Sequence, residues 1–459
     1  MTNPQLDTAA VESFASNLRG QLLCSGDDGY DEARTIWNAM IDKHPALIAR
    51  CTDDSDVVQS VNFARDNDLL VSIRGSGHNV SGNAICDGGL MIDLSLMKHV
   101  EVDTERLVAR VGAGVLWREF DQETQAFGLA TTGGTISTTG VSGLTLGGGV
   151  GWLMGKHGLA CDNLISIDIV TAEGQLLTAS DSQNQDLFWG LRGGGGNFGV
   201  ATAFEFQLHP VGEVLGGMII HPLDQAVELA KFYPEFTSTS PDELGSMFVF
   251  VTSPEGERVV AIAVCYNGSV DEGTRVLEPL RAFGTPLADM ISPMPYTQVQ
   301  AMLDEGFPAG LQNYWKSNFL SGLDETAIEL LVDHVRNAPS PNSAIAIEHF
   351  GGAVNRVGAN DTAFNHRGAR YNLIILGMWP DASDKDENVS WVRNLWDAMQ
   401  PYSSGGVYVN YLGQEADEGP ERIKAAYGQE KYERLVTIKN NYDPSNLFQL
   451  NQNIKPTVT

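Results

Sequence analysis

Residues 69–78 read Leu-Leu-Val-Ser-Ile-Arg-Gly-Ser-Gly-His, an apolar run that breaks directly into a turn with alternating glycines. Glycine reaches positive φ without steric cost, so such a turn lets several backbone N–H groups converge on one anion. The turn lacks the Gly-x-Gly-x-x-Gly spacing of dinucleotide-binding folds and the lysine of a P-loop. It carries His78 instead, at the lip of the predicted cradle. Taken alone, this pattern also fits an ordinary surface turn.

A second glycine-rich block lies downstream, where residues 133–151 read GGTISTTGVSGLTLGGGVG. An interior glycine costs about 0.5–1 kcal/mol relative to alanine in a helix or strand, so we expect irregular backbone here. The residues between the glycines include Ile136, Val141, Leu144 and Leu146, which argues against a solvated linker. A buried irregular loop leaves backbone donors that need partners. The block therefore predicts an anionic ligand close to its backbone, with a purely structural crossover as the alternative.

These blocks are part of a series of motifs that runs along nearly the whole chain. RGSGHNVSG (74–82), GGTISTTGVSGLTLGGGVGWL (133–153), KHGLACDNLISIDIVTAEG (156–174) and DLFWGLRGGGGNFGV (186–200) resemble the FAD-binding domain of the vanillyl-alcohol-oxidase superfamily. YVNYL (408–412) and KNNYDPSNLFQLNQNIKP (439–456) resemble its berberine-bridge-enzyme-like branch. Within that branch the chain is similar to bacterial single-chain oxidases, including flavoproteins of polyketide tailoring. The resemblance implies an FAD-dependent oxidoreductase.

Chain length and the resemblance together indicate two domains. At 459 residues the chain exceeds the ~250–300 residues at which a single core stops growing. The resemblance implies an α+β, two-domain fold of the p-cresol-methylhydroxylase type (PCMH-type). We expect an FAD-binding domain over residues 1–212, a substrate domain of antiparallel sheet covered by helices over 213–412, and a segment 413–459 that returns to the FAD domain.

Local patterns agree with this division. Strand-like residues 46–51 and 69–73 flank a polar N-cap region and apolar residues at helical spacing, which predicts a β-α-β unit ending at Arg74. In such folds ligands bind at the C-terminal ends of strands. Beyond residue 211, amphipathic helices alternate with strands, typical of helices laid on an antiparallel sheet. The helices are expected at 225–236, 271–283, 326–335 and 388–399, and the strands at 245–251, 259–265, 343–350 and 371–378.

Composition excludes several classes of partner. Acidic residues number 58 against 29 Lys plus Arg, whereas a surface for nucleic acid or anionic membrane needs clustered basic residues. No apolar run approaches the ~20 residues of a membrane span, and the first residues show no secretory signal. We therefore expect a cytoplasmic monomer or homodimer that meets a small organic substrate and O2. Neither a metal site nor a disulfide framework is expected from the scattered cysteines Cys24, Cys51, Cys86, Cys161 and Cys265.

The resemblance also implies how the cofactor is held. In the family, the histidine of the R-G-x-G-H motif is bonded to the 8α carbon of FAD, and His78 holds that position. Relatives with a second tether carry a cysteine where this chain has Ile136, which cannot form the bond, so a single link through His78 is implied. The other implied cofactor-binding residues are Arg74, Gly75, Ser76, Gly77, Asn79, Gly82, Gly133, Gly134, Thr135, Thr139, Gly140, Gly143, Gly149, Asn163, Ile169, Tyr408, Asn410 and Asn451.

Four residues are candidates for catalysis. Thr139 holds the family position beside the reactive C4a–N5 edge of the flavin, where a small side chain suits oxidases; a loop threonine without that role is the alternative. The family's catalytic tyrosine falls in residues 408–411, so Tyr411 is the first candidate for the base that takes the substrate proton and Tyr408 the second. A tyrosine with a free pKa of about 10 would need a nearby cation. Lys316 is that candidate, unless it is a surface lysine.

Glu348 is the remaining candidate base. Glu348 and His349 are neighbours on one predicted strand and therefore point to opposite faces of the sheet. Only one of them can face the flavin, and we expect Glu348 to do so. A solvated strand glutamate is the alternative.

The function implied is that of an oxidase. It would take a hydride from a small organic alcohol, sugar lactol, amine or natural-product intermediate to FAD and pass the electrons to O2, giving hydrogen peroxide. Two alternatives stay open: a tailoring enzyme that holds oxygen on the flavin N5 as an N5-oxide, and a catalytically silent flavin-binding protein. An intact His78 and the complete Tyr-x-Asn-Tyr motif argue against silence. No sequence signature names the substrate.

Overall fold

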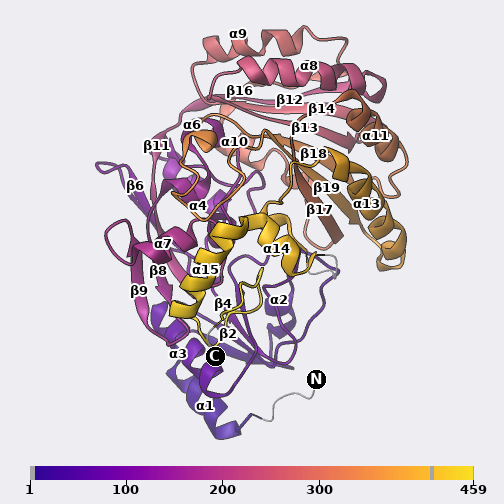
Figure 1. The fold of residues 1–459 in the computed structure, drawn as a ribbon. Coiled ribbons are helices and arrows are strands. Elements are labelled where there is room, and N and C mark those ends of the chain that lie inside the picture. Colours follow the sequence, from indigo (N-terminus) through magenta and orange to yellow (C-terminus); the bar gives the residue numbers. More distant parts are fainter. Residues whose placement is uncertain (1–5, 414–417, 458–459) are drawn as a thin grey trace.

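The computed structural model describes residues 6–413 and 418–457, which fold into two lobes (Figure 1). The first lobe carries two small sheets, and the second carries one large antiparallel sheet with long helices on one face. This is the α+β arrangement that the sequence predicts. Among the described residues, no helix is long and apolar enough to cross a membrane. Part of the predicted signal-free N-terminus, residues 1–5, lies outside the described chain.

The N-terminal sheet delivers the first glycine turn. Its strands, in spatial order, are β1 (Gln21–Cys24), β2 (Leu47–Arg50), β4 (Leu90–Asp93) and β3 (Val71–Arg74). β4 runs parallel to both β2 and β3. The connecting helix α3 (Asp54–Asp66) is N-capped by Asp53, whose carboxylate accepts the N–H of Ser55 at 2.9 Å. The predicted β-α-β unit is confirmed, and it ends at Arg74.

A second sheet completes the first lobe. Its strands, in spatial order, are β5 (Val100–Asp103), β6 (Val108–Gly112), β10 (Val200–Gln207), β8 (Leu164–Val170) and β9 (Leu176–Ser180). A two-stranded ribbon pairs β7 (Leu129–Ala130) with β11 (His209–Pro210). The helical elements of this lobe are α1 (Thr8–Asn17), α2 (Tyr30–Arg34), α4 (Trp117–Gln125), α5 (Val141–Leu146), α6 (Met154–His157), η1 (Ala160–Asn163) and α7 (Gln185–Leu191).

The large sheet of the second lobe forms the wall opposite the glycine-rich loops. Its strands, in spatial order, are β15 (Ala288–Asp289), β12 (Glu213–Pro222), β14 (Arg258–Tyr266), β13 (Leu244–Thr252), β18 (Ala344–His349), β19 (Tyr371–Trp379) and β17 (Gln312–Leu320), with β16 (Ser292–Pro295) beside β12. All of these pairs are antiparallel.

The long helices of the second lobe cover one face of this sheet (Figure 1). They include α8 (Ala226–Thr239), α9 (Val270–Arg281), α11 (Glu325–Arg336) and α13 (Lys385–Met399), and the shorter elements are η2 (Leu223–Gln225), α10 (Tyr296–Ala301), η3 (Asp304–Gly306), α12 (Ala353–Arg356), η4 (Ala382–Asp384) and η5 (Gln400–Tyr402). Phe248, Ile347 and Leu373 point into a core with the long helices. The alternate residues of the same strands therefore face the first lobe.

The chain then returns to the first lobe. After η6 (Val409–Tyr411), α14 (Pro420–Tyr427) and α15 (Gln429–Tyr442) lie across it, and α15 packs on α7. The buried ammonium of Lys439 donates to the carbonyl of Asn197 at 2.8 Å and to Asp443 at 2.6 Å. The return begins before residue 413, because Val407 and Leu412 already belong to the first lobe's core.

Two local expectations need correction. The glycine-rich block is not wholly irregular, since it contains α5, in which Val141 and Thr145 bury one side and Gly143 is the interior glycine. Four strands of the large sheet were also missed, β12, β15, β16 and β17. β12 contains a glycine pair, and β17 mixes polar with apolar residues on both of its faces, so neither shows clean alternation.

Candidate functional site

A cavity between the lobes brings most of the predicted site residues together. The first lobe contributes the two glycine-rich loops, and the second contributes the face of its sheet opposite the long helices. The predicted residues that line the cavity are Gly75, Ser76, Gly77, His78, Asn79, Thr135, Thr139, Gly140, Gly143, Glu348, Tyr408, Asn410, Tyr411 and Asn451.

The other predicted cofactor residues lie behind the wall. The Arg74 guanidinium donates to the carbonyl of Ala33, away from the cavity. Gly82, with φ +66°, forms a turn packed on Ile41, and Ile169 is buried within β8. Arg74, Gly82 and Ile169 therefore support the sheet and the turn beside the cavity, and they do not line the cavity.

Four more predicted residues also act from behind the lining. Gly133 packs against Trp117, and the carbonyl of Gly134 accepts from Gln300 Nε2 at 2.5 Å. The amide of Asn163 donates to the carbonyls of Leu159 (2.8 Å) and His157 (3.0 Å). Gly149, at φ +90°, donates its N–H to the Tyr408 hydroxyl at 2.9 Å. These contacts fix the shape of the loops.

Sequence reasoning missed several lining residues. Gly195, Gly196 and Gly199 face the cavity, and the four consecutive glycines at 193–196 were an available signal. A missed neighbour of the lining is Trp37, whose ring stacks on the lining residue His78 with centroids 4.6 Å apart and an interplanar angle of 14°. No local pattern marks Trp37, because the contact joins segments 41 positions apart.

His78 is held as a neutral imidazole. Burial lowers the pKa of His78 to about 4, and the Trp37 ring covers one of its faces. His78 Nε2 is buried and has no hydrogen-bond partner among the described residues. His78 therefore brings to the cavity lining a neutral imidazole with one unpaired nitrogen.

The glycine-rich loops leave bare backbone toward the cavity. At Gly143 and Gly196 nothing lies within 4 Å of where a Cβ would stand, and both residues line the cavity. The N–H of Gly140 donates to Ser76 Oγ at 2.9 Å, which ties the two loops together. Bare backbone beside an unpaired histidine nitrogen fits the flavin nucleotide that the sequence implies, because close approach of a large ligand requires missing side chains.

The last three residues of the Tyr-x-Asn-Tyr motif form the 3₁₀ turn η6. The Tyr408 hydroxyl accepts from Gly149 N–H and, at 2.7 Å, from Asn410 Nδ2, which also donates to the carbonyl of Leu144 at 3.0 Å. Burial raises the pKa of Tyr408. Tyr408 and Asn410 therefore anchor the turn on the second glycine-rich block.

Glu348 faces the cavity from β18, and His349 lies on the opposite face against Tyr371. Glu348 is buried, Oε1 accepts the Tyr411 hydroxyl at 2.9 Å, and Oε2 accepts Asn372 Nδ2 at 2.7 Å. Burial raises the pKa of Glu348 to about 7, against the opposing effect of these two hydrogen bonds. Burial and the neighbouring Glu348 charge raise the pKa of Tyr411 well above its ordinary value.

Lys316 does not serve as the predicted cation for Tyr411. It lies on β17 next to the cavity-lining Trp315, so its side chain leaves the opposite face of the sheet. There its buried ammonium pairs with Glu418 at 2.6 Å and lies 4.9 Å from the centroid of the Trp396 ring. The alternative of a surface lysine is wrong as well.

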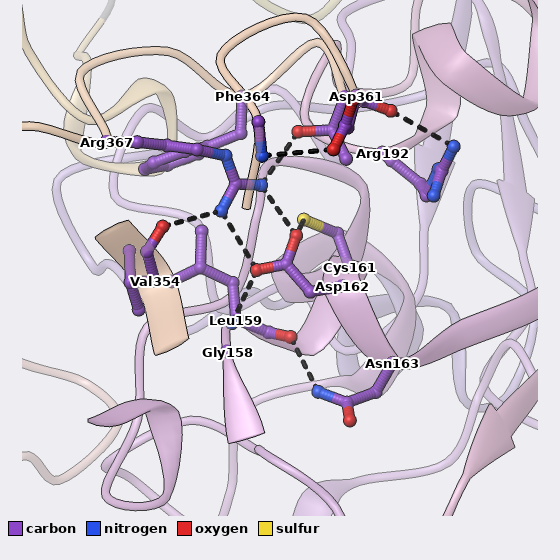
Figure 2. Close-up of polar contacts among 12 residues, drawn as sticks. Gly158, Leu159, Cys161, Asp162, Asn163, Arg192, Val354, Asp361, Phe364 and Arg367 are labelled. Carbon is purple, nitrogen blue, oxygen red and sulfur yellow. Dashed lines mark hydrogen bonds and ion pairs between the residues drawn. The ribbon is translucent and has the colours of Figure 1, made fainter. Parts of the chain in front are cut away.

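A buried ion pair clamps the β18–β19 connection onto the first lobe (Figure 2). The Arg367 guanidinium binds both carboxylate oxygens of Asp162, at 2.6 and 3.0 Å, and these side chains are only 5% and 6% exposed. The same connection carries Phe364, whose ring would be 2.6 Å from a Cβ on Gly148. The clamp therefore holds Phe364 on the glycine-rich loop beside Tyr408.

This clamp predicts a large stability effect. Arg367→Met leaves the buried Asp162 unpaired, and breaking a buried pair costs about 3–5 kcal/mol. The free energy of unfolding from urea denaturation should fall by that amount. The matched control is Arg356→Gln, because the Arg356–Asp242 pair is 60% and 39% exposed and such pairs contribute about 0–1 kcal/mol. Equal effects of the two variants would contradict the clamp.

Known proteins match this chain over most of its length. The family model described as "FAD binding domain" matches residues 45–180, and "Berberine and berberine like" matches residues 407–455. An FAD-linked oxidoreductase of Dictyostelium discoideum is 34% identical over 98% of this chain and 97% of its own. The (R)-6-hydroxynicotine oxidase of Paenarthrobacter nicotinovorans is 32% identical over 96% of this chain and 97% of its own. The crystal structure of 6-hydroxy-D-nicotine oxidase from Arthrobacter nicotinovorans has a TM-score of 0.88 at 31% identity, covering 95% of this chain and 98% of that one.

Proposed function

This chain belongs to the berberine-bridge-enzyme-like FAD-linked oxidoreductases of the vanillyl-alcohol-oxidase superfamily, and on that premise we propose that it is an oxidase of a small organic alcohol, lactol, amine or natural-product intermediate. Bound FAD supplies a hydride acceptor whose electrons pass to O2, giving hydrogen peroxide. The observation that carries the proposal is the buried carboxylate of Glu348, which faces the cavity opposite the glycine-rich loops.

Glu348 acts as the base that takes the substrate's O–H or N–H proton. A pKa of about 7 leaves the carboxylate partly ionised at neutral pH and makes it a stronger proton acceptor than an ordinary glutamate. Tyr411 is the first candidate base from the sequence, but its strongly raised pKa keeps it protonated at neutral pH and so makes it a poor base. Its hydroxyl donates to Glu348 Oε1, so Tyr411 is a positioning residue that orients the carboxylate and stabilises its ionised form.

Two variants separate these roles. In the wild type, anaerobic flavin reduction by substrate should quicken as pH rises through about 7, because Glu348 must lose its proton first. Glu348→Gln should lower that rate about 10²–10⁴-fold and abolish the pH dependence, as expected for loss of a general base. Tyr411→Phe removes a hydrogen bond that favours the ionised carboxylate, so its rising limb should move to higher pH. Stopped-flow absorbance of the flavin measures both.

Tyr408→Phe is the control for this pair, because the Tyr408 hydroxyl contacts the glycine-rich loop and not Glu348. Its pH profile should keep the wild-type midpoint. If Glu348→Gln reduces flavin at the wild-type rate while Tyr411→Phe does not, the base is Tyr411 and the assignment of Glu348 is wrong.

Single covalent attachment through His78 is supported by its neutral, stacked ring and its unpaired Nε2. Acid-precipitated protein should stay yellow, and the flavin-bearing peptide should contain His78. His78→Ala should lose the tether yet still bind FAD, since the glycine-rich loops remain. Free FAD released from the denatured wild type, or a flavin-bearing cysteine peptide, would overturn this prediction.

Thr139 is proposed to leave the oxygen-reactive edge of the cofactor open. It lines the cavity and is half-buried. Hydrogen peroxide should accumulate in step with oxidised product in the wild type. Thr139→Leu should slow reoxidation in air while anaerobic reduction changes little, and Thr139→Val, which keeps the size, should behave like the wild type. Equal slowing of both half-reactions in Thr139→Leu would show that the residue shapes the whole pocket instead.

A further inference from the structure

Three neighbouring strands of the second lobe line the cavity in register. Their pairing sets Met247 on β13 beside Glu348 on β18, and in the next row Val249, Ala346 and Ile374 lie side by side. All five residues line the cavity. Because residues two apart on a strand share a face, the rows continue along the same wall.

The wall is a trough with β18 as its floor. Ala346 and Ala344 present the shortest side chains, between Val249 on one flank and Ile374 and Leu376 on the other. A strand advances about 3.3 Å per residue, so the floor runs about 13 Å from Glu348 to Ala344. That length exceeds one six-membered ring and accommodates two rings joined end to end.

The trough offers a bound molecule almost no polar partner. Among the lining residues that β13, β18 and β19 contribute in the described chain, Glu348 alone carries a side-chain oxygen or nitrogen. The nearby Trp315 also lines the cavity, but its indole N–H already donates to Asn313 Oδ1 at 3.2 Å. Each sugar hydroxyl buried here would lack a hydrogen bond, and one such group lowers affinity by about tenfold.

We propose that the substrate is an elongated, apolar alcohol or amine, about two rings long, whose single polar group meets Glu348 and whose hydrocarbon body lies along Ala346 and Ala344. Oligosaccharides are excluded as substrates. This inference rests on the proposed oxidase function and narrows the substrate class within it. In the reaction the carbon bearing the polar group loses a hydride to FAD, Glu348 takes the proton, and O2 accepts the electrons to give hydrogen peroxide.

Four probes test the proposal, matched to one another in ring number or in head group. 4-Phenylbenzyl alcohol and 4-phenylbenzylamine match cellobiose in having two rings, and benzyl alcohol lacks the second ring. Dissociation constants are measured by calorimetry on anaerobic Glu348→Gln holoenzyme, in which proton removal is blocked, and flavin reduction is followed separately in the wild type. We expect a two-ring probe to bind at least about tenfold more tightly than benzyl alcohol, as burial of a second ring predicts, and cellobiose not to bind.

A second experiment fills the trough with a larger side chain and measures binding of the same probes. Ala346→Met, built into the same Glu348→Gln background, should weaken binding of the two-ring probe by about tenfold or more. The matched control is Ile347→Val on the same strand, because Ile347 packs into the core with the helices and does not line the cavity. It should leave binding of the two-ring probe unchanged.

The outcomes of these experiments distinguish failure of the apolar two-ring substrate from failure of the oxidase function. Cellobiose that binds as tightly as the two-ring probes, or that reduces the flavin and yields hydrogen peroxide, would overturn the inference and leave the oxidase function standing. Tight two-ring binding lost in Ala346→Met would support the trough even if no probe gave hydrogen peroxide, which would count against the oxidase. An Ala346→Met variant with wild-type affinity for every probe would also overturn the trough. The probe that reduces the flavin faster identifies the head group as alcohol or amine.

Discussion

The hydrogen bond from the Tyr411 hydroxyl to Glu348 Oε1 couples the two lobes at the cavity. Tyr411 belongs to a turn that Tyr408 and Asn410 anchor on the second glycine-rich block, and Glu348 belongs to the large sheet. A change in how the lobes pack would therefore move the carboxylate relative to the loops that fit the cofactor. The buried Arg367–Asp162 clamp (Figure 2) also holds the β18–β19 connection of the second lobe on the first lobe.

One physical cause accounts for both the chemistry and the selectivity proposed for the cavity. The apolar trough that leaves sugar hydroxyls without partners also desolvates Glu348 and raises its pKa from 4.5 to about 7. Because folding favours the protonated form, this shift costs stability as pH rises through that window, and the cost is complete above pH 7. At about 1.4 kcal/mol per pKa unit, the cost is roughly 3 kcal/mol. A glutamine would avoid it, so a carboxylate here points to function.

Much of the first lobe was predictable because its signals are local. The N-cap at Asp53, the returning strand before Arg74 and the bare glycines each lie within a few residues of one another. Strand alternation likewise placed Glu348 and His349 on opposite faces. The pairing of Lys316 with Glu418 and of Arg367 with Asp162 was not predictable, since these contacts join residues 102 and 205 positions apart. Such pairs depend on tertiary packing that no local pattern reports.

We propose that Glu348 is a cavity carboxylate that loses its proton near neutral pH. Infrared difference spectroscopy of the holoenzyme, compared with Glu348→Gln, follows the carboxyl C=O stretching band of this one residue. We expect a protonated band that disappears as pH rises through about 7 and that is missing in Glu348→Gln. A Glu348 carboxylate that stays ionised down to the ordinary pH range of a glutamate would contradict it.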